Sequence, residues 1–354
     1  MFRDLMLEDI FTLQEKGQHT FIDVRSPKEF NEATIPGSIN IPVFDDEERA
    51  EIGTLYKHNG QEVAMERGLE VFSEKLPDFI RAFKLIKTPM TVFCWRGGMR
   101  SKTAATVLDL MGIHTTRLSG GIRSYRQWIV HELEKENFPP NFIVLNGYTG
   151  TGKTEILKRL ANNGYPVIDF EHIAGHRGSI FGQIGLEPSN QKKFDSLLVR
   201  ELERFKTEQY VFIEGESRRI GKVSLPQFIY EKKEIGMQIV IHLPLEERVK
   251  IVLADYEPWN NPERFKEAFQ LIKKRLHTPI AKEIETHLEN GEFAWVVELL
   301  LEHYYDPRYK HSGYQNTDIQ KVDIDAKNIE DAFQKVLHTI EREQLRLGVI
   351  ASEF

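Results

Sequence analysis

The chain has 354 residues, of which 40% are hydrophobic and 29% are charged. This is the composition of an ordinary globular protein, and it excludes collagen-like, coiled-coil and wholly disordered chains. Lys and Arg total 47 against 54 for Asp and Glu, so the formal net charge is -7. This negative net charge excludes binding of nucleic acid through overall charge alone, so any polyanion has to bind at a local basic patch. The single cysteine, Cys94, cannot form a disulfide within the chain.

Targeting and membrane segments are not evident in the sequence. The first residues carry acids early and lack an apolar core followed by a small-residue cleavage site. No run approaches the roughly 20 apolar residues that a membrane-spanning helix needs. We therefore expect a cytoplasmic protein that makes no contact with a membrane.

The first third of the chain alternates short apolar runs with helical patterns. Residues 20–24 (TFIDV) and 89–93 (PMTVF) are predicted strands, and the second ends directly before Cys94. Apolar residues at helical spacing predict a helix over 101–111, which Gly112 would end. Strand, tight loop and helix in this order are typical of α/β domains, and they place Cys94 at the carboxyl end of a strand.

A domain boundary is predicted at residues 132–141. This segment is charged and ends close to the pair Pro139-Pro140, a composition that suits a linker better than a regular element. The first domain would then span residues 1–131 and the second residues 142–354. The length alone predicts roughly two or three domains, and two is the better number.

The second domain begins with a buried-strand pattern at 142–145 (FIVL), followed by a Gly-rich turn and a helix. Further strand candidates are 211–213 and 238–243, and from Glu246 onward the pattern is mainly helical. We therefore predict an α/β protein whose second domain has a mainly helical C-terminal part.

The loop that begins at Cys94 has the composition of an anion cradle. Residues 94–101 (CWRGGMRS) leave the predicted strand and enter the predicted helix. Backbone N–H groups converge in such a turn, and the helix N-terminus adds a partial positive charge. Together with Arg96 and Arg100 these groups would favour the thiolate, a nucleophile. The alternative is that Cys94 is a small buried hydrophobe.

The residues around this loop resemble rhodanese domains. Residues 21–30 (FIDVRSPKEF) and 35–42 (IPGSINIP) are similar to their N-terminal motif, and 118–122 (LSGGI) to their closing motif. Rhodaneses carry sulfur or selenium on the one cysteine. The spacing from Cys94 to Arg100 is C-x5-R, however, where single rhodanese domains usually have C-x4-R. The longer loop resembles rhodanese-fold phosphatases, so chalcogen transfer and phosphate-ester hydrolysis both stay open.

A phosphate-binding loop follows the linker. Residues 147–154 (GYTGTGKT) match G-x-x-x-x-G-K-[ST] at every fixed position, between a strand and a helix. The pattern predicts that phosphate is bound by the glycines, Lys153 and the Thr154 hydroxyl, the last of which is also placed to hold Mg²⁺. These candidate diphosphate-binding residues are Gly147, Gly150, Gly152, Lys153 and Thr154.

Acidic residues end a neighbouring predicted strand. Glu214 and Glu216 stand where P-loop NTPases have the acid that orders the metal, although Asp is more usual there. The alternative for Glu214 is a solvated acid at a strand end. The loop therefore predicts diphosphate binding and not nucleotide hydrolysis.

The two halves together resemble the bacterial tRNA 2-selenouridine synthases over essentially the whole chain. The similar stretches are 94–101, 176–179 (HRGS), 214–221 (EGESRRIG) and 304–309 (YYDPRY). Arg177 and Arg218 lie in two of these stretches. For each of them, the alternatives are a contact with the substrate and an ion pair within its own domain. Both possibilities stay open.

The resemblance implies a transferase that acts on wobble 2-thiouridine of tRNA. Members of this family replace sulfur by selenium from selenophosphate, and they attach a geranyl group from geranyl diphosphate to the same sulfur. Cys94 would then handle selenium, with Arg96, Gly97, Gly98 and Arg100 binding selenophosphate, and the P-loop would hold the diphosphate. The enzyme that supplies selenophosphate is an implied partner; the sequence does not indicate an oligomeric state.

The region around Cys94 is locally basic. Between residues 94 and 128 six Lys and Arg oppose one Asp, a formal charge of +5, and 273–275 (KKR) forms a second cluster. Tyr125, Trp128 and Trp259 are candidates for stacking on unpaired bases. Solvated helix faces are the alternative for these charges.

Three other functions are compatible with these motifs. The chain could be a sulfurtransferase with a regulatory nucleotide-binding module, or a C-x5-R phosphatase. A non-enzymatic adaptor built on two inactive folds is the third, and the complete motifs around Cys94 and Lys153 disfavour it.

Overall fold

The computed structural model describes residues 2–15, 19–311 and 320–350. The chain forms two compact units. The first runs to Lys135 and includes Asn190–Val199, and the second comprises Glu136–Ser189 and the chain from Arg200 onward. Within the described residues, no helix is long and apolar enough to cross a bilayer.

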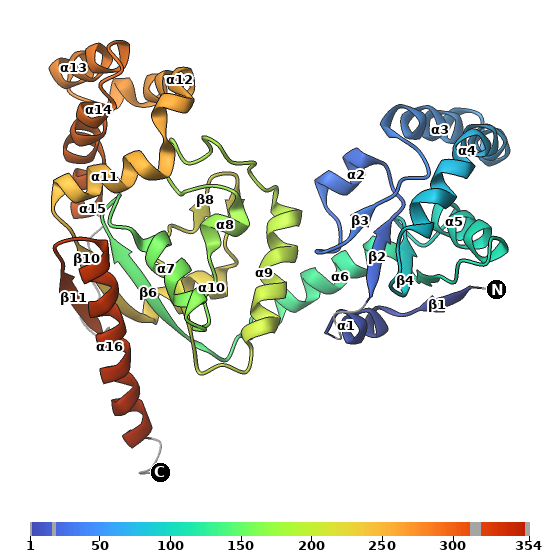
Figure 1. Cartoon of the computed structure of the whole chain (residues 1–354), viewed down its shortest axis with the longest axis horizontal. Coiled ribbons are helices and arrows are strands. Elements are labelled where there is room, and N and C mark those ends of the chain that lie inside the picture. The colour runs from blue at the N-terminus through green and yellow to red at the C-terminus, as the bar shows by residue number, and fades with distance from the viewer. Residues whose placement is uncertain (1, 16–18, 312–319, 351–354) are drawn as a thin grey trace. The chain divides into compact units, whose positions relative to one another are not determined.

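The sheet of the first unit is parallel throughout, in the order β1-β5-β4-β2-β3 (Figure 1). The predicted strands at 20–24 and 89–93 are confirmed as β2 and β4. The shorter strands β1, β3 and β5 were not predicted. The strands are β1 (Arg3–Leu5), β2 (Thr20–Asp23), β3 (Ile39–Asn40), β4 (Met90–Phe93) and β5 (Thr116–Leu118).

Both faces of this sheet are buried, which is usual for parallel sheets. Ile22 and Val92 pack in one apolar cluster and Phe21 and Phe93 in another, so successive residues of β2 and β4 face opposite layers. The helices of the unit are α1 (Leu7–Glu15), α2 (Pro27–Glu32), α3 (Asp46–His58), α4 (Gln61–Lys84), α5 (Met99–Leu110) and α6 (Gly121–Glu134).

The boundaries of the units differ from the expected ones in two respects. Helix α6 continues to Glu134, because Ile129 is buried and Leu133 is partly buried in the core of the first unit, so the start of the expected linker 132–141 is helical. Residues Asn190–Val199, expected in the second domain, group with the first unit, whose core includes Val199.

The sheet of the second unit is also parallel, in the order β11-β10-β6-β7. The strand predictions at 142–145, 211–213 and 238–243 are confirmed as β6, β7 and β10, while β11 was not expected. Because β6 lies between β10 and β7, the loop that follows it leaves from the interior of the sheet. The strands are β6 (Asn141–Gly147), β7 (Tyr210–Glu214), β10 (Met237–His242) and β11 (Lys321–Asp325), with a separate hairpin of β8 (Arg219–Ile220) and β9 (Val223–Ser224).

Helices from the C-terminal half of this unit form a layer of their own, in which α14 packs against α11 and α13 (orange to red-brown in Figure 1). The predicted helical character after Glu246 is confirmed, apart from β11. The helical segments are α7 (Lys153–Asn162), α8 (Phe170–Ala174), α9 (Gln191–Phe205), which begins in the first unit, α10 (Gln227–Ile235), α11 (Leu245–Tyr256), η1 (Pro258–Asn260), α12 (Pro262–Ile272), η2 (Lys273–Arg275), α13 (Thr278–Glu289), α14 (Phe293–Leu300), η3 (Leu301–Tyr305), α15 (Asp306–His311) and α16 (Ile329–Ile350).

Candidate functional site

Cys94 is the first residue after β4, in the loop that leads into α5. Its side chain is 3% exposed, and its Sγ lies 3.2 Å from the Ser101 Oγ in the first turn of α5. Helix α5 begins after Gly98, which has no side chain to cap the first N–H groups. These N–H groups are free to bind an anion, as the sequence predicts for this loop.

The first turn of α6 holds the cysteine loop by its backbone. The Cys94 carbonyl accepts a hydrogen bond of 2.9 Å from the Ile122 amide, and the Trp95 carbonyl one of 3.0 Å from the Arg123 amide. A Cβ at Gly121 would lie 2.2 Å from the Cys94 carbonyl oxygen, so this approach needs glycine. The motif at 118–122 therefore positions the loop.

The two candidate arginines of the loop have different surroundings. Arg100 is bound to Glu29 by two hydrogen bonds of 2.5 and 3.3 Å, so its charge is already paired within the unit. Arg96 is exposed and has no hydrogen bond or ion pair to the residues described. Of the two, Arg96 is the one available to an incoming anion.

Arg117 on β5 also supports this loop, a role that the sequence did not reveal. Its guanidinium donates to the Gly97 carbonyl at 2.8 Å and to the Asp4 carboxylate. Hydrogen bonding to Asp4 raises the pKa of Arg117, and the nearby Cys94 sulfur adds to the effect. The sequence showed Arg117 only as one of several local charges, because its partner Asp4 is more than a hundred residues away.

A pocket of about 280 Å³ adjoins the loop in the first unit, where Trp95 and Arg100 form part of its wall. Tyr125 is 4% exposed, and Trp128 packs on Phe11 with ring centroids 4.2 Å apart. The prediction that these two aromatics stack on bases is therefore disfavoured, since both serve the core. Trp259 is exposed.

The P-loop connects β6 to α7 with the expected geometry. Lys153 folds back over the loop, and its Nζ donates to the Gly147 carbonyl at 3.0 Å. Gly150 has a φ of +81°, and a Cβ there would lie 2.8 Å from the Arg248 carbonyl oxygen, so the loop packs too closely for a side chain. Gly152 precedes the first turn of α7. The five predicted P-loop residues thus lie together.

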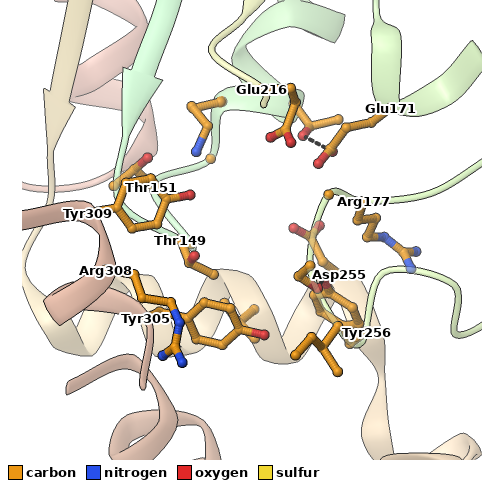
Figure 2. Close-up of a pocket in the computed structure, with 18 of the residues that line it drawn as sticks. Thr149, Thr151, Glu171, Arg177, Glu216, Asp255, Tyr256, Tyr305, Arg308 and Tyr309 are labelled. Carbon is orange, nitrogen blue, oxygen red and sulfur yellow. Dashed lines mark hydrogen bonds between the residues drawn. The ribbon is translucent and has the colours of Figure 1, made fainter. Parts of the chain in front are cut away.

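A pocket of about 290 Å³ opens beside this loop. Cations and acids both line it, with Lys153, Arg177 and Arg308 on one hand and Glu171, Glu216 and Asp255 on the other. Figure 2 shows Glu171 and Glu216 at one side of the pocket and Tyr256 and Tyr305 at the other. The pocket therefore has an acidic side with Glu171 and Glu216 and an aromatic side with Tyr256 and Tyr305, beside which Asp255 and Arg308 lie.

Three carboxylates form the acidic part of this site. Glu171, Glu214 and Glu216 each bring an oxygen within 4.8 Å of the others. Glu214 is fully buried; one oxygen accepts the Glu171 amide at 2.7 Å, and the other has no partner in the described structure. The Thr154 hydroxyl donates to Glu171 at 3.2 Å. Oxygen donors of these kinds suit a divalent cation such as Mg²⁺.

Burial and mutual repulsion both act on these carboxylates. Burial, and then the charge of Glu216, raise the pKa of Glu171 to about 8. Burial raises the pKa of Glu214 as well, and so does the charge of Glu171. Sequence reasoning identified Glu214 and Glu216 but missed Glu171, which follows the short apolar run 166–168 and lies on α8.

Arg248 and Asp306 form a buried clamp behind the P-loop, which sequence reasoning also missed. The Arg248 guanidinium donates to the Thr149 carbonyl at 2.9 Å and to both Asp306 oxygens, at 2.9 and 2.6 Å. Asp306 lies within the stretch 304–309 singled out in the sequence. The family-like stretch is thus tied to the phosphate-binding loop.

The two remaining predicted site residues lie in different surroundings. Arg177 lines the P-loop pocket, donates to the Ile184 carbonyl at 2.8 Å and lies over the Tyr256 ring. Arg218 is exposed and is not part of the pocket wall. The structure therefore brings Arg177, but not Arg218, to the phosphate-binding loop.

Comparison with known proteins agrees with this arrangement. The family model for the tRNA 2-selenouridine synthase AAA domain matches residues 140–340, and that for the rhodanese-like domain matches residues 7–127. The tRNA 2-selenouridine synthase of Nitrosomonas eutropha is 31% identical, over 81% of this chain and 87% of its own. That of Hydrogenovibrio crunogenus is 34% identical, over 82% and 88%. With both folds, both loops and this similarity in one chain, the protein belongs to the tRNA 2-selenouridine synthase family.

Proposed function

We propose that this protein converts wobble 2-thiouridine in tRNA into 2-selenouridine, with S-geranyl-2-thiouridine as intermediate. The P-loop pocket would bind geranyl diphosphate, and the Cys94 loop would handle selenium from selenophosphate. The observation that carries the proposal is the presence of two loops that each lead from a strand into a helix without a side-chain cap, one with a buried thiol and the other with a lysine and no cysteine.

The proposed conversion has two steps, and each step is assigned to one of these two sites. In the first step the thiouridine sulfur attacks C1 of geranyl diphosphate; a C–S bond forms, the C–O bond breaks, and diphosphate leaves while N3 of the base loses its proton. Lys153 and the P-loop amides would stabilise the charge that develops on the diphosphate. Alkylation converts a thiocarbonyl into a thiol leaving group.

In the second step the selenium of selenophosphate attacks C2 of the base. A C–Se bond forms, the C–S bond breaks, and geranylthiol leaves with a proton. Water then cleaves the P–Se bond, so that phosphate leaves and the selenium stays on C2. Arg96, the Gly97-Gly98 backbone and the uncapped start of α5 would bind the selenophosphate anion. Because Arg100 is paired with Glu29, we assign it to supporting the loop.

The carboxylates of the P-loop pocket would hold Mg²⁺ together with Thr154 if the diphosphate binds as a metal complex. Glu171, Glu214 and Glu216 are the candidate ligands. The cation would supply charge neutralisation for the diphosphate.

The tRNA would meet the basic stretch between residues 94 and 128, where Arg100, Arg117 and Arg126 are paired with acids and Arg96, Lys102 and Arg123 have no ion pair among the described residues. Binding to phosphates at this stretch predicts that affinity falls steeply with salt. The enzyme that makes selenophosphate is a candidate partner, since the donor is a reactive small molecule.

The deciding experiment adds the substrates in order to the purified protein and an RNA that contains 2-thiouridine. Mass spectrometry of the nucleosides should show S-geranyl-2-thiouridine after geranyl diphosphate, and 2-selenouridine after subsequent selenophosphate. Sulfur transfer from thiosulfate to cyanide without either product would instead favour a sulfurtransferase. Rapid hydrolysis of an aryl phosphate would favour a phosphatase.

A further inference from the structure

A second, smaller cavity adjoins the pocket beside the P-loop. Five residues line both, namely Thr149, Ser179, Val252, Tyr256 and Tyr305. Thr149 belongs to the P-loop itself, so the cavity begins next to the backbone that would hold a diphosphate. The pocket has a volume of about 290 Å³ and the cavity one of about 30 Å³. The cavity is therefore a small extension on the aromatic side of the pocket.

The inner wall of this extension is apolar. Phe181 and Phe265 stack with ring centroids 5.2 Å apart, and Val297, Leu300 and Leu301 from α14 and η3 complete the wall. Each of these five side chains is at most 5% exposed. They belong to two apolar clusters of the helical layer, so the side chains of the wall are packed against further buried apolar residues.

Two of the four hydroxyl-bearing side chains at its mouth bind each other, since the Ser179 Oγ and the Tyr256 hydroxyl lie 2.8 Å apart. Among the residues that line the extension, none carries a charge. Beyond the mouth, a ribose or a base would meet only apolar side chains and would lose its hydrogen bonds to water without replacement, at a considerable cost, whereas a hydrocarbon loses none.

We propose that this extension receives the end of the prenyl chain whose diphosphate binds at the P-loop, and that Phe265, Val297 and Leu300 limit the chain to ten carbons. The inference rests on the function proposed above and adds the residues that set chain length. A group the size of water needs roughly 10–15 Å³ of such a volume, so about two groups of that size fit. The geranyl chain ends in two methyl groups, and five further carbons would meet the wall.

Val297 offers a matched test because its neighbour Val296 is buried equally well but does not line the extension. Val297→Ala removes two methyl groups from the wall, and Val296→Ala removes the same atoms from the adjoining core. We expect the ratio of kcat/KM for farnesyl diphosphate to that for geranyl diphosphate to rise roughly tenfold or more in V297A, the scale of a pocket that gains a methylene-sized space. In V296A the ratio should stay within about twofold of wild type.

The converse variant narrows the extension. Val297→Leu adds one methylene, and we expect it to raise the KM for geranyl diphosphate roughly tenfold while that for dimethylallyl diphosphate, with five carbons, changes little. Inhibition by inorganic diphosphate should be equal in all variants, since the P-loop is untouched. This variant also keeps the proposal testable if V297A is poorly folded.

The outcomes separate the two proposals. If the wild-type protein transfers no prenyl group to 2-thiouridine from any of the three diphosphates, the proposed function fails. If it transfers geranyl but V297A and V297L keep the wild-type chain-length preference, the extension does not determine chain length. The same conclusion follows if V296A changes that preference as much as the Val297 variants do. A shift confined to the Val297 variants, with unchanged inhibition by diphosphate, supports both proposals.

Discussion

The loop after β4 and the loop after β6 follow the same plan and differ in what surrounds the anion they would bind. Each leaves a buried parallel strand and enters a helix whose first turn lacks a side-chain cap. In the first unit a buried thiol stands at the strand end; in the second, Lys153 lies over loop carbonyls opposite three carboxylates. In the proposed function, one local geometry would thus serve a reacting group in one case and binding alone in the other.

The supports of the two loops differ as well. Backbone hydrogen bonds from the first turn of α6, with one side-chain contact from Arg117, hold the cysteine loop, whereas the Arg248–Asp306 clamp holds the P-loop by side chains. Support by backbone hydrogen bonds tolerates substitution of many side chains, but it requires glycine where the two backbone segments are in contact. A buried ion pair fails if either partner is lost. The comparison therefore predicts different sensitivities to mutation.

The largest expected effect is that of Cys94→Ala. We expect selenium transfer to fall by roughly 10³-fold or more, since removal of a reacting side chain abolishes the step it performs. Geranylation should stay within about twofold of wild type, measured by nucleoside mass spectrometry. Cys94→Ser, which keeps a hydroxyl near Ser101, should behave like the alanine variant. Loss of both selenium transfer and geranylation would show that the two loops do not carry separate reactions.

Lys153→Ala should affect the other loop. We expect kcat/KM for geranyl diphosphate to fall roughly 10²- to 10³-fold, because a cation positioned at developing charge is lost. Selenium transfer to RNA that already carries S-geranyl-2-thiouridine should continue at the normal rate. Lys250→Ala, at an exposed lysine of α11, is the control and should change neither reaction. Normal geranylation in K153A would place the diphosphate elsewhere.

Asp306→Asn tests the support of the P-loop. Removing one partner of the buried pair leaves the Arg248 charge uncompensated, and we expect the second unit to lose about 3 kcal/mol of stability. Hydrogen exchange of β6 and α7 peptides measures this loss within the unit. Arg159→Ala, which breaks exposed ion pairs to Glu155 and Glu330, should cost less than about 1 kcal/mol. Equal losses in the two variants would contradict the clamp.

Glu29→Gln should give the smallest effect, and one that depends on pH. Burial alone would raise the pKa of Glu29, but the hydrogen bonds and charge of Arg100, with the charge of Arg49, outweigh it and lower the pKa. The carboxylate is therefore ionised more readily in the folded protein, and its contribution, about 1–2 kcal/mol, is present above the ordinary pKa of 4.5 and lost as the pH falls through the lowered value.

Hydrogen exchange of β4 and α5 peptides in wild type and E29Q, compared at neutral pH and near pH 4, measures this difference. Glu51→Gln, at an exposed pair with Arg67, is the control and should change little at either pH. A difference between wild type and E29Q that stays constant across this range would show that the pair does not titrate as described.

Local pattern was sufficient for the parts of the fold that depend on neighbours in sequence. Apolar runs and spacings within a short stretch of sequence are enough to recognise strands β2, β4, β6, β7 and β10 and helix α5. The same holds for the P-loop, because its glycines and Lys153 are consecutive. The edge strands β1 and β11 carry too few apolar residues to be recognised, and only their partners define them.

Long-range contacts decided the rest. Glu171 joins Glu214 because α8 and β7 meet in space, and Asp306 reaches Arg248 across 58 positions of sequence. Arg100 looked like an anion ligand beside Cys94, but tertiary structure pairs it with Glu29, 71 positions away. The motif around Cys94 predicts which atom reacts, since the reactivity of a thiol depends on the thiol and its adjacent backbone. Which charges remain available to a substrate depends on pairing between distant side chains, and only the folded chain determines that.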